Sequence, residues 1–307
     1  MEKTSPLCFL TLLLTLVVGG CGSEPETRLI DLAIVGTHDA AAYNASPRLR
    51  CQDLTLEEQL EVGVRAFDLR LVDRYDGSGR MDLYHGKESL GLEFTEDVLP
   101  LFTQFLTAHP DEFVILSLRK EDDEHHSPDE MEAYSLSLLR ALKRSEVAQL
   151  LYRGELTPAT KVSEVRGKLL ILLRTRIGDD VCMPCFDGFQ DDTTFVARLV
   201  NPCGGNLDLM VEDKYMVYDT IGMRDKKSAL SEVLDLAETM PDHWMIAYLS
   251  GTGDLTPEAV AEEINPFAYH LLRERTSLPG GIYFMDFAGM PEARAIITLC
   301  KKHNSKI

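Results

Sequence analysis

Short apolar runs rich in β-branched residues recur along the chain from residue 29 onward, and each is a candidate strand. The runs lie at residues 29–36, 64–72, 81–86, 113–120, 168–174, 209–215, 244–250 and 281–287. The run KLLILLR at 168–174 is apolar at nearly every position, which is typical of a strand covered on both faces. We therefore expect a largely parallel sheet buried beneath helices.

Helical patterns separate several of these strands, at residues 55–63, 94–110, 127–144 and 226–240. The helix at 127–144 carries its own start signal, because Ser127 can cap it and Pro128 suits its first position. Eight strands alternating with helices predict an α/β protein built as a single TIM-type (β/α)8 barrel. We expect this barrel to be irregular, since the first helix is short and residues 81–86 follow the second strand almost directly.

The first 28 residues have a different character from the rest. After Lys3 comes an apolar stretch of signal-peptide length, and small residues then precede Cys21 in the sequence VGGC. This pattern resembles a bacterial lipobox, which predicts a signal peptide at 1–20, acylation of Cys21, a short tether at 21–28 and a barrel domain at 29–307. We expect an exported protein anchored to a bacterial cell-envelope membrane, or a secreted protein where the lipobox is not used.

The net charge and the cysteine content bear on the partners, substrates and disulfides that this protein can have. A net charge of −19 disfavours nucleic acid as a partner, so an anionic substrate would need its own local group of arginines. Nothing in the sequence indicates an obligate protein partner, and we expect a monomer. Disulfides are permitted outside the cytoplasm, and the CMPC segment favours a structural bridge, with Cys203 as one candidate partner. Besides Cys21, the exported chain has five cysteines whose pairing stays open: Cys51, Cys182, Cys185, Cys203 and Cys300.

Polar and charged residues gather at the ends of the predicted strands, where the active sites of such barrels lie. They are His38, Asp39, Asp68, Arg70, His85, Arg119, Glu121, Arg174, Asp213, Tyr215 and Asp286. Two histidines at strand ends suit phosphodiester cleavage, because one can take a proton from an attacking hydroxyl while the other protonates the leaving oxygen. Arg70 could hold a phosphate oxygen; alternatively, Asp68 and Arg70 form a structural ion pair on one face of their strand.

The fragments VGTHDA, GVRAFDLRL, LYHG, LSLRKE, GKLLILLR, VEDKY and MDF occur in the order seen in the X-domain family of phosphatidylinositol-specific phospholipases C. The chain resembles this family, in its bacterial form, from about Leu29 to Asp286. The resemblance implies a diacylglycerol product and an inositol 1,2-cyclic phosphate, formed by attack of the inositol 2-hydroxyl on the neighbouring phosphorus.

The resemblance also implies roles for individual residues. His38 corresponds to the general base and Asp286 to the carboxylate that orients it, while His85 corresponds to the general acid with Asp39 as its partner. Arg70 corresponds to the arginine that binds the phosphate. Arg119 falls where the family has a lysine near the site, and the positions where the bacterial enzymes contact the inositol ring are Glu121, Arg174, Asp213 and Tyr215. We also expect Asp68 among the substrate-binding residues.

Metal use can be argued from charge. Eukaryotic relatives of the family bind calcium with an acid where this chain has Arg70 and an asparagine where it has Asp39. A cation and an arginine would compete for one place, and calcium needs several oxygen ligands. We therefore expect a metal-independent enzyme without a cofactor, acting on an inositol phospholipid at a membrane surface.

Several positions depart from the family pattern and leave the substrate open. They include Ala40, Lys87, Arg119 in place of lysine, and the segment CMPCFDGFQDD, in which Asp187 is a candidate inositol contact. One alternative is another phosphodiesterase on the same barrel, acting on glycerophosphodiesters or sphingolipids with a bound metal. A second is a non-catalytic lipoprotein that binds inositol phosphates. We expect the lone Trp244 to be buried in a strand.

Overall fold

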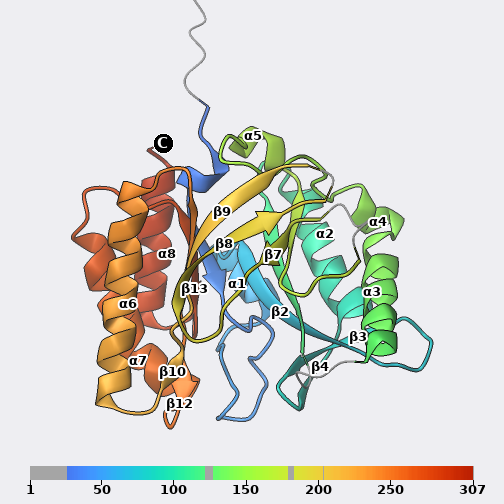
Figure 1. The fold of residues 1–307 in the computed structure, drawn as a ribbon, viewed down its shortest axis with the longest axis horizontal. Helices are drawn as coiled ribbons and strands as arrows, with labels where there is room; N and C mark the ends of the chain where they lie inside the picture. The colour runs from blue at the N-terminus through green and yellow to red at the C-terminus, as the bar shows by residue number, and fades with distance from the viewer. Residues whose placement is uncertain (1–25, 122–126, 179–182, 203, 307) are drawn as a thin grey trace, which may run out of the picture.

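The computed structural model describes residues 26–121, 127–178, 183–202 and 204–306. Within these ranges a single sheet closes on itself into a barrel, because β1 pairs with β2 at Gly36–Ala66 and Thr37–Phe67 (Figure 1). Around the ring the strands are β1 (Ala33–Thr37), β13 (Gly281–Met285), β11 (Trp244–Leu249), β9 (Asn206–Glu212), β8 (Thr194–Val200), β7 (Cys185–Asp187), β6 (Leu169–Leu173), β5 (Val114–Lys120) and β2 (Ala66–Asp73). The predicted barrel is confirmed.

The barrel is irregular, as expected, but the irregularity differs from the prediction. The predicted strand at 81–86 is β3 (Met81–His85), which pairs antiparallel with β2 and with β4 (Glu88–Glu93) outside the ring. The link from β2 is too short for the crossover that a parallel strand requires, so the chain turns back as a hairpin. Its expected place in the ring is taken by β7 and by β8, which runs antiparallel to both of its neighbours.

Two apolar clusters lie on either side of the barrel wall. The interior cluster contains alternate strand residues such as Ile34, Leu170 and Ile246, and the 3-10 helix η1 (Leu29–Asp31) adds Leu29 and Ile30. The other cluster packs the opposite strand faces against the helices. β6 and β11 are buried at every residue, as their apolar sequences predict, and Trp244 is fully buried in β11.

Helices cover the outside of the barrel, with α6, α7 and α8 on one side and α2, α3 and α4 on the other (Figure 1). They are α1 (Leu56–Val62), η2 (Phe94–Val98), α2 (Leu99–Ala108), α3 (Pro128–Leu142), α4 (Ser145–Ala148), α5 (Val162–Val165), α6 (Thr220–Thr239), α7 (Pro257–Arg273) and α8 (Pro291–Asn304). Ser127 and Glu130 form the capping box that starts α3, as the sequence predicts. α6 begins at Thr220 rather than at 226, because Asp219 caps it.

The remaining predictions on the termini and cysteines are only partly covered by the described residues. The predicted signal peptide and Cys21 lie outside them, as do Cys182 and Cys203, while Cys51, Cys185 and Cys300 carry free thiols. None of the helices in the described ranges combines the length and apolar character needed to cross a membrane.

Candidate active site

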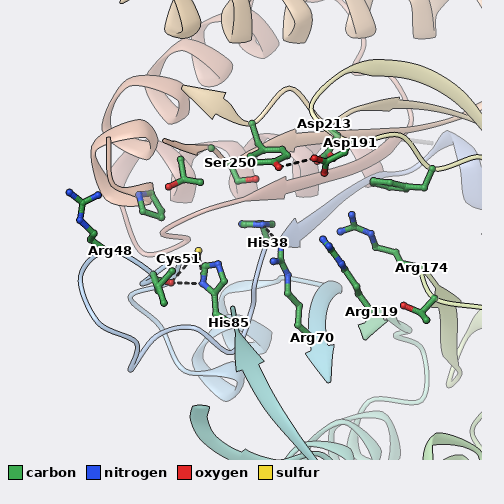
Figure 2. Close-up of a pocket in the computed structure, with 17 residues that line it drawn as sticks. His38, Arg48, Cys51, Arg70, His85, Arg119, Arg174, Asp191, Asp213 and Ser250 are labelled. Atoms are coloured by element: carbon green, nitrogen blue, oxygen red, sulfur yellow. Dashed lines mark hydrogen bonds between the residues drawn. The ribbon is translucent and has the colours of Figure 1, made fainter. Parts of the chain in front are cut away.

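A cavity of about 480 Å³ opens at the carboxyl ends of the barrel strands (Figure 2). Its size falls within the range usual for small-molecule sites. One wall carries histidines and arginines from β1, β2, β3, β5 and β6, and the other carries Asp191, Asp213, Tyr215 and Ser250. The cavity therefore lies where a barrel of this type places its active site.

His38 follows the last residue of β1 and is held there on both of its ring nitrogens. Its Nδ1 lies 2.9 Å from Asp286 Oδ1, and its Nε2 lies 2.8 Å from Arg70 Nη2. A guanidinium can only donate, so this network assigns the lone pair to Nε2 and the proton to Nδ1, which donates to Asp286. Burial, followed by the charge of Arg70, holds the pKa of His38 well below its usual range, so the ring is neutral.

Asp39 lies at the centre of the charged groups. Its backbone adopts the left-handed conformation (φ 41°), and its side chain is almost fully buried. Oδ2 lies 3.2 Å from His85 Nε2, 3.2 Å from Arg70 Nε and 3.9 Å from His38 Nε2. Burial raises the pKa of Asp39 to about 6, although Arg70 and His85 oppose the shift.

His85 ends β3 and faces Asp39. Its Nδ1 lies 2.7 Å from the Leu49 carbonyl, which can only accept, so Nδ1 carries a proton there. Nε2 can then carry a second proton only in the imidazolium form, which the Asp39 carboxylate is placed to stabilise. The next residue, Gly86, takes a positive φ of 58° and donates its amide to Glu121 at 2.7 Å, which fixes the turn behind the histidine.

Arg70 is the cation that links these groups. Besides His38 and Asp39, it lies 3.7 Å from Asp68 and 3.4 Å from Glu121. Asp68 is fully buried and Glu121 nearly so, and neither lines the cavity. The structure thus places these two predicted substrate contacts behind the cavity wall, where they hold Arg70.

The opposite wall consists of residues around the end of β9. The Tyr215 hydroxyl donates to Asp191 at 2.9 Å, and burial raises the pKa of Tyr215 to about 12. Burial likewise raises the pKa of Asp213 to about 6, although Arg174 opposes it. This wall offers carboxylate oxygens and an aromatic ring, which suit the hydroxyls and face of a sugar-like ring.

The structure brings together His38, Asp39, Arg70, His85 and Asp286 around one point, and it places Arg119, Arg174, Asp213 and Tyr215 on the cavity walls. Asp187, the candidate contact in the CMPC segment, lies in β7 and lines a separate small pocket instead. The cavity residues missed from the sequence are Arg48, Leu49, Cys51, Thr175, Phe189, Asp191, Ser250, Gly251, Thr252 and Pro257. Most lie in loops, where periodicity gives no signal.

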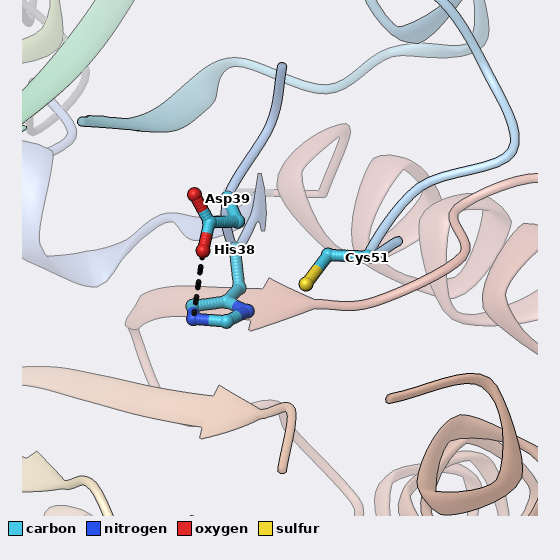
Figure 3. A group of neighbouring side chains, drawn as sticks. All are labelled: His38, Asp39 and Cys51. Carbon is cyan, nitrogen blue, oxygen red and sulfur yellow. Dashed lines mark ion pairs between the residues drawn. The ribbon is translucent and has the colours of Figure 1, made fainter. Parts of the chain in front are cut away.

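His38, Asp39 and Cys51 are close enough together to be tested as metal ligands (Figure 3). Both ring nitrogens of His38 already have partners, and the Arg70 guanidinium occupies the space between His38 and Asp39. Burial holds the pKa of Cys51 well above its usual range, so this thiol is protonated and a poor ligand. The three residues do not fit a metal ion.

Comparison with known proteins points to one family. No protein-family model matches the chain. Over 160 residues the chain is 32% identical to a 1-phosphatidylinositol phosphodiesterase of Listeria monocytogenes, covering 48% of this chain and 45% of that protein. The matched region thus spans less than half of the length of this curated relative.

Solved structures share the fold over nearly the whole chain. A phosphatidylinositol-specific phospholipase C from Staphylococcus aureus superposes with a TM-score of 0.73 at 22% identity, covering 89% of this chain and 93% of that one. The chain is related to the bacterial-type phosphatidylinositol-specific phospholipases C. The structure of the phosphatidylinositol-specific phospholipase C from Listeria monocytogenes gives a TM-score of 0.66 at 23% identity, over 91% and 96% of the two chains.

In the described chain, two histidines each lie beside a carboxylate, and Arg70 contacts both His38 and Asp39. At 22–23% identity the structural comparison establishes the fold. The chemistry of the site is argued below from its own residues.

Proposed function

We propose that this protein cleaves the phosphodiester of phosphatidylinositol, or of another inositol-containing lipid, into diacylglycerol and inositol 1,2-cyclic phosphate. One observation carries the proposal. Nε2 of His38 carries a lone pair and is hydrogen-bonded to Arg70, and Nε2 of His85 lies 3.2 Å from the Asp39 carboxylate that Arg70 also contacts. His38 is thus placed to accept a proton, and His85, in its imidazolium form, to give one. General acid–base cleavage of a phosphodiester needs this pairing.

The first step removes the proton of the inositol 2-hydroxyl. His38 Nε2 accepts this proton while the hydroxyl oxygen attacks phosphorus, and Asp286 stabilises the imidazolium that forms. Because the nucleophile and the phosphate belong to one molecule, binding alone supplies most of the alignment. Asp286 is thus a positioning residue, and it is fully buried behind the ring.

The bond from phosphorus to the glycerol oxygen breaks as the new ring bond forms. His85 donates its Nε2 proton to that oxygen, so diacylglycerol leaves as a neutral alcohol. Arg70 neutralises the charge that develops on the phosphate oxygens, with Asp68 and Glu121 holding its orientation from behind. The proton taken by His38 equals the one given by His85, and solvent exchange restores both rings.

Without substrate, Arg70 donates to the very nitrogen that must act as base. A bound phosphate competes for the guanidinium, frees the lone pair of His38 and places a negative charge beside it. Both effects raise the pKa of His38 from its depressed position toward that of a useful base. The base is therefore activated by the substrate it is to act upon.

The same groups support metal independence, because Arg70 supplies the positive charge that a metal would provide. We further propose an exported, monomeric enzyme that meets its lipid at a membrane surface and is anchored through Cys21. The sequence VGGC supports the anchor, and the acidic surface argues against nucleic acid as a partner.

The proposal is tested by turnover of phosphatidylinositol vesicles in EDTA with His38→Gln beside the unmutated protein. We expect kcat to fall about 10²- to 10⁴-fold, since general base catalysis contributes about that much. Binding of inositol 1-phosphate should persist, because Arg70 and the opposite wall are untouched. Turnover that disappears in EDTA and returns with calcium would contradict the proposal, as would full activity of His38→Gln.

A further inference from the structure

The two halves of the proposed base lie in turns with an unusual backbone conformation. His38 and Asp286 are each followed by a residue with positive φ, Asp39 at 41° and Phe287 at 51°. Residues other than glycine rarely adopt this conformation, and it persists only where surrounding contacts hold it. Whatever holds these two turns therefore also fixes the distance between the imidazole and its carboxylate.

The side chain of Gln52 joins the two turns. Gln52 lies in the loop before α1, is fully buried and does not line the cavity. Its Nε2 donates to the His38 carbonyl at 2.7 Å and to the Met285 carbonyl at 3.0 Å. Its Oε1 accepts from the Ala288 amide at 3.3 Å. One side chain thus holds the end of β1 and the chain on both sides of Asp286.

The partners of Gln52 leave it a single orientation. Backbone carbonyls only accept and a backbone amide only donates, so these three bonds assign both the Nε2 and the Oε1 positions. Both amide hydrogens are used, and burial excludes water as a substitute partner. The amide is therefore a rigid connection between the two turns.

The backbone next to Gln52 supports the same connection. The Cys51 carbonyl accepts from the amide of Phe287 at 2.8 Å, so it holds the second turn at its positive φ. The Cys51 amide donates to the Ala42 carbonyl at 3.1 Å, in the loop that follows β1. Residues 51–52 thus lie between the loops that follow β1 and β13.

Other polar side chains hold one turn each. Asn265 on α7 donates to the Asp286 carbonyl at 3.0 Å, and Gln59 on α1 donates to the Ala40 carbonyl at 2.8 Å. Among the described residues, Gln52 is the side chain that hydrogen-bonds to the backbone of both turns. The backbone adds one direct bond between them, from the His38 amide to the Met285 carbonyl at 3.0 Å.

We infer that Gln52 is a positioning residue for the proposed general base, and that it sets the hydrogen bond between His38 Nδ1 and Asp286 Oδ1. This inference rests on the proposed function. The two atoms lie 2.9 Å apart, and the carboxylate stabilises the imidazolium that forms when His38 takes the substrate proton. That stabilisation falls as the two groups separate. Loosening the turns would therefore weaken the base while leaving every group that lines the cavity in place.

The first test compares Gln52→Met, which keeps the size of the side chain but donates no hydrogen bond, with the unmutated protein on phosphatidylinositol vesicles in EDTA. We expect kcat to fall about 10- to 100-fold, because displacing a catalytic group by about 1 Å can cost that much. KM should change little, since Arg70 and Arg119 keep their places. The acid limb of the kcat–pH profile should move to lower pH, because a weaker contact with Asp286 lowers the pKa of the base.

The charged and titratable groups around the His38 ring are the same in this variant, so they do not contribute to the shift. They are Asp39, Cys51, Arg70, His85, Arg174, Lys226, Tyr248 and Asp286.

Proton NMR of the free protein gives a second readout that needs no turnover. The Nδ1 proton of His38 is donated to a carboxylate, and a proton in such a hydrogen bond resonates far downfield. His38→Gln removes this signal and so assigns it. In Gln52→Met the signal should move upfield, because the bond to Asp286 lengthens.

Two further variants separate positioning from stability. Gln52→Asn keeps the amide on a side chain one methylene shorter, so it should shift the pH profile and the Nδ1 signal less, in the same direction. It decides the question if Gln52→Met does not fold. Asn304→Leu is the matched control, because Asn304 bonds to the amide and carbonyl of Ala33, at the amino end of β1. It should lower stability and leave both readouts unchanged.

A folded Gln52→Met protein with the pH profile and Nδ1 signal of the unmutated protein would overturn the inference and leave the proposed function intact. The same shifts in Asn304→Leu would also overturn it, since they would then follow from lost stability. A folded protein that cleaves no inositol lipid would overturn the proposed function, and the NMR comparison would still show whether Gln52 sets the contact between His38 and Asp286.

Discussion

At the scale of single residues, the site depends on carboxyls and imidazoles that burial pushes toward their neutral forms. Asp39 and Asp213 have pKa values raised to about 6, and that of His38 is lowered. Shifts of this kind, in groups gathered around a cavity, are typical of active sites. They also make the stability of the fold depend on pH.

Asp213 allows this dependence to be measured at one position, because no hydrogen bond joins its carboxyl to another described residue and none of those would be lost with the charge. A raised pKa means that the folded state binds the proton more readily than the unfolded chain does, so stability falls as pH rises from about 4 to 6. Asp213→Asn should therefore be more stable than the unmutated protein at pH 7, with a free energy of unfolding, measured in urea, that is higher by about 3 kcal/mol. The two should coincide near pH 4.

Asp208→Asn serves as the control for that measurement. The Arg198 guanidinium holds the pKa of Asp208 below its usual range, so the sign is opposite and the exposed pair contributes little. This variant should be slightly less stable than the unmutated protein at pH 7. A stability curve of Asp213→Asn that runs parallel to that of the unmutated protein from pH 4 to 7 would refute the assignment.

At the scale of elements, one buried ion pair joins α6 to the barrel. Lys226 Nζ lies 2.9 Å from both oxygens of Glu212 and also donates to the Tyr248 carbonyl, and both side chains are fully buried. Tyr248 in turn meets the His38 ring edge-on, with centroids 6.1 Å apart. Helix attachment and the position of the base are thus linked through β11.

Removing one partner of this pair should cost more than removing both. Lys226→Met leaves Glu212 buried and unpaired, and the free energy of unfolding should fall by about 3–5 kcal/mol. Glu212→Gln combined with Lys226→Met should recover part of that loss. Urea denaturation of the single and double variants gives the coupling, and additive losses would show that the two side chains do not interact.

Much of the fold could be predicted from the pattern of apolar residues. Runs such as Leu169–Leu173 are buried on both faces, and the serine cap and capping box of α3 follow local rules. β7 and β8 were missed, because β7 has three residues and β8 alternates buried and exposed positions within a loop-like segment. Whether such segments form strands depends on pairing with strands that are distant in the sequence, and this pairing cannot be recognised in a single sequence.

The candidate site likewise contains residues that could be predicted from the sequence and residues that could not. Strand-end residues such as His38, Arg70 and His85 could be found because parallel strands bring their carboxyl ends to one edge. Loop residues such as Arg48 and Asp191 could not, since their place in the cavity depends on loop conformation. The positive φ of Asp39 could not be predicted from the sequence either, although this conformation turns the carboxylate toward both histidines.

At the scale of the whole molecule, the described chain enters the barrel beside the amino end of β1, whereas the cavity lies at the carboxyl ends of the strands. Arg28 is fixed there by ion pairs with Asp31 and Asp242, and the Leu29 amide donates to Thr160. An anchor at Cys21 would thus attach to the face away from the cavity mouth. Arg28, the last residue of the predicted tether, and the strand-end site therefore lie at opposite ends of the barrel.

This arrangement predicts that anchoring and catalysis can be separated. In a bacterial host that processes lipoproteins, the unmutated chain should sediment with membranes and Cys21→Ser should stay in the soluble fraction. Turnover of a soluble inositol phosphodiester should be equal for the two, because the change is remote from the cavity. Recovery of the unmutated chain in the soluble fraction with an unacylated N-terminus would contradict the anchor.

The central claim is that two imidazoles and one guanidinium suffice to close the phosphate into a ring without a metal. Phosphorus NMR of the purified protein with phosphatidylinositol in excess EDTA tests it most directly. The account predicts that the diester resonance decays while the signal of a five-membered cyclic phosphate grows. Product that appears only as the open monoester from the outset, or no product until a divalent metal is restored, would contradict it.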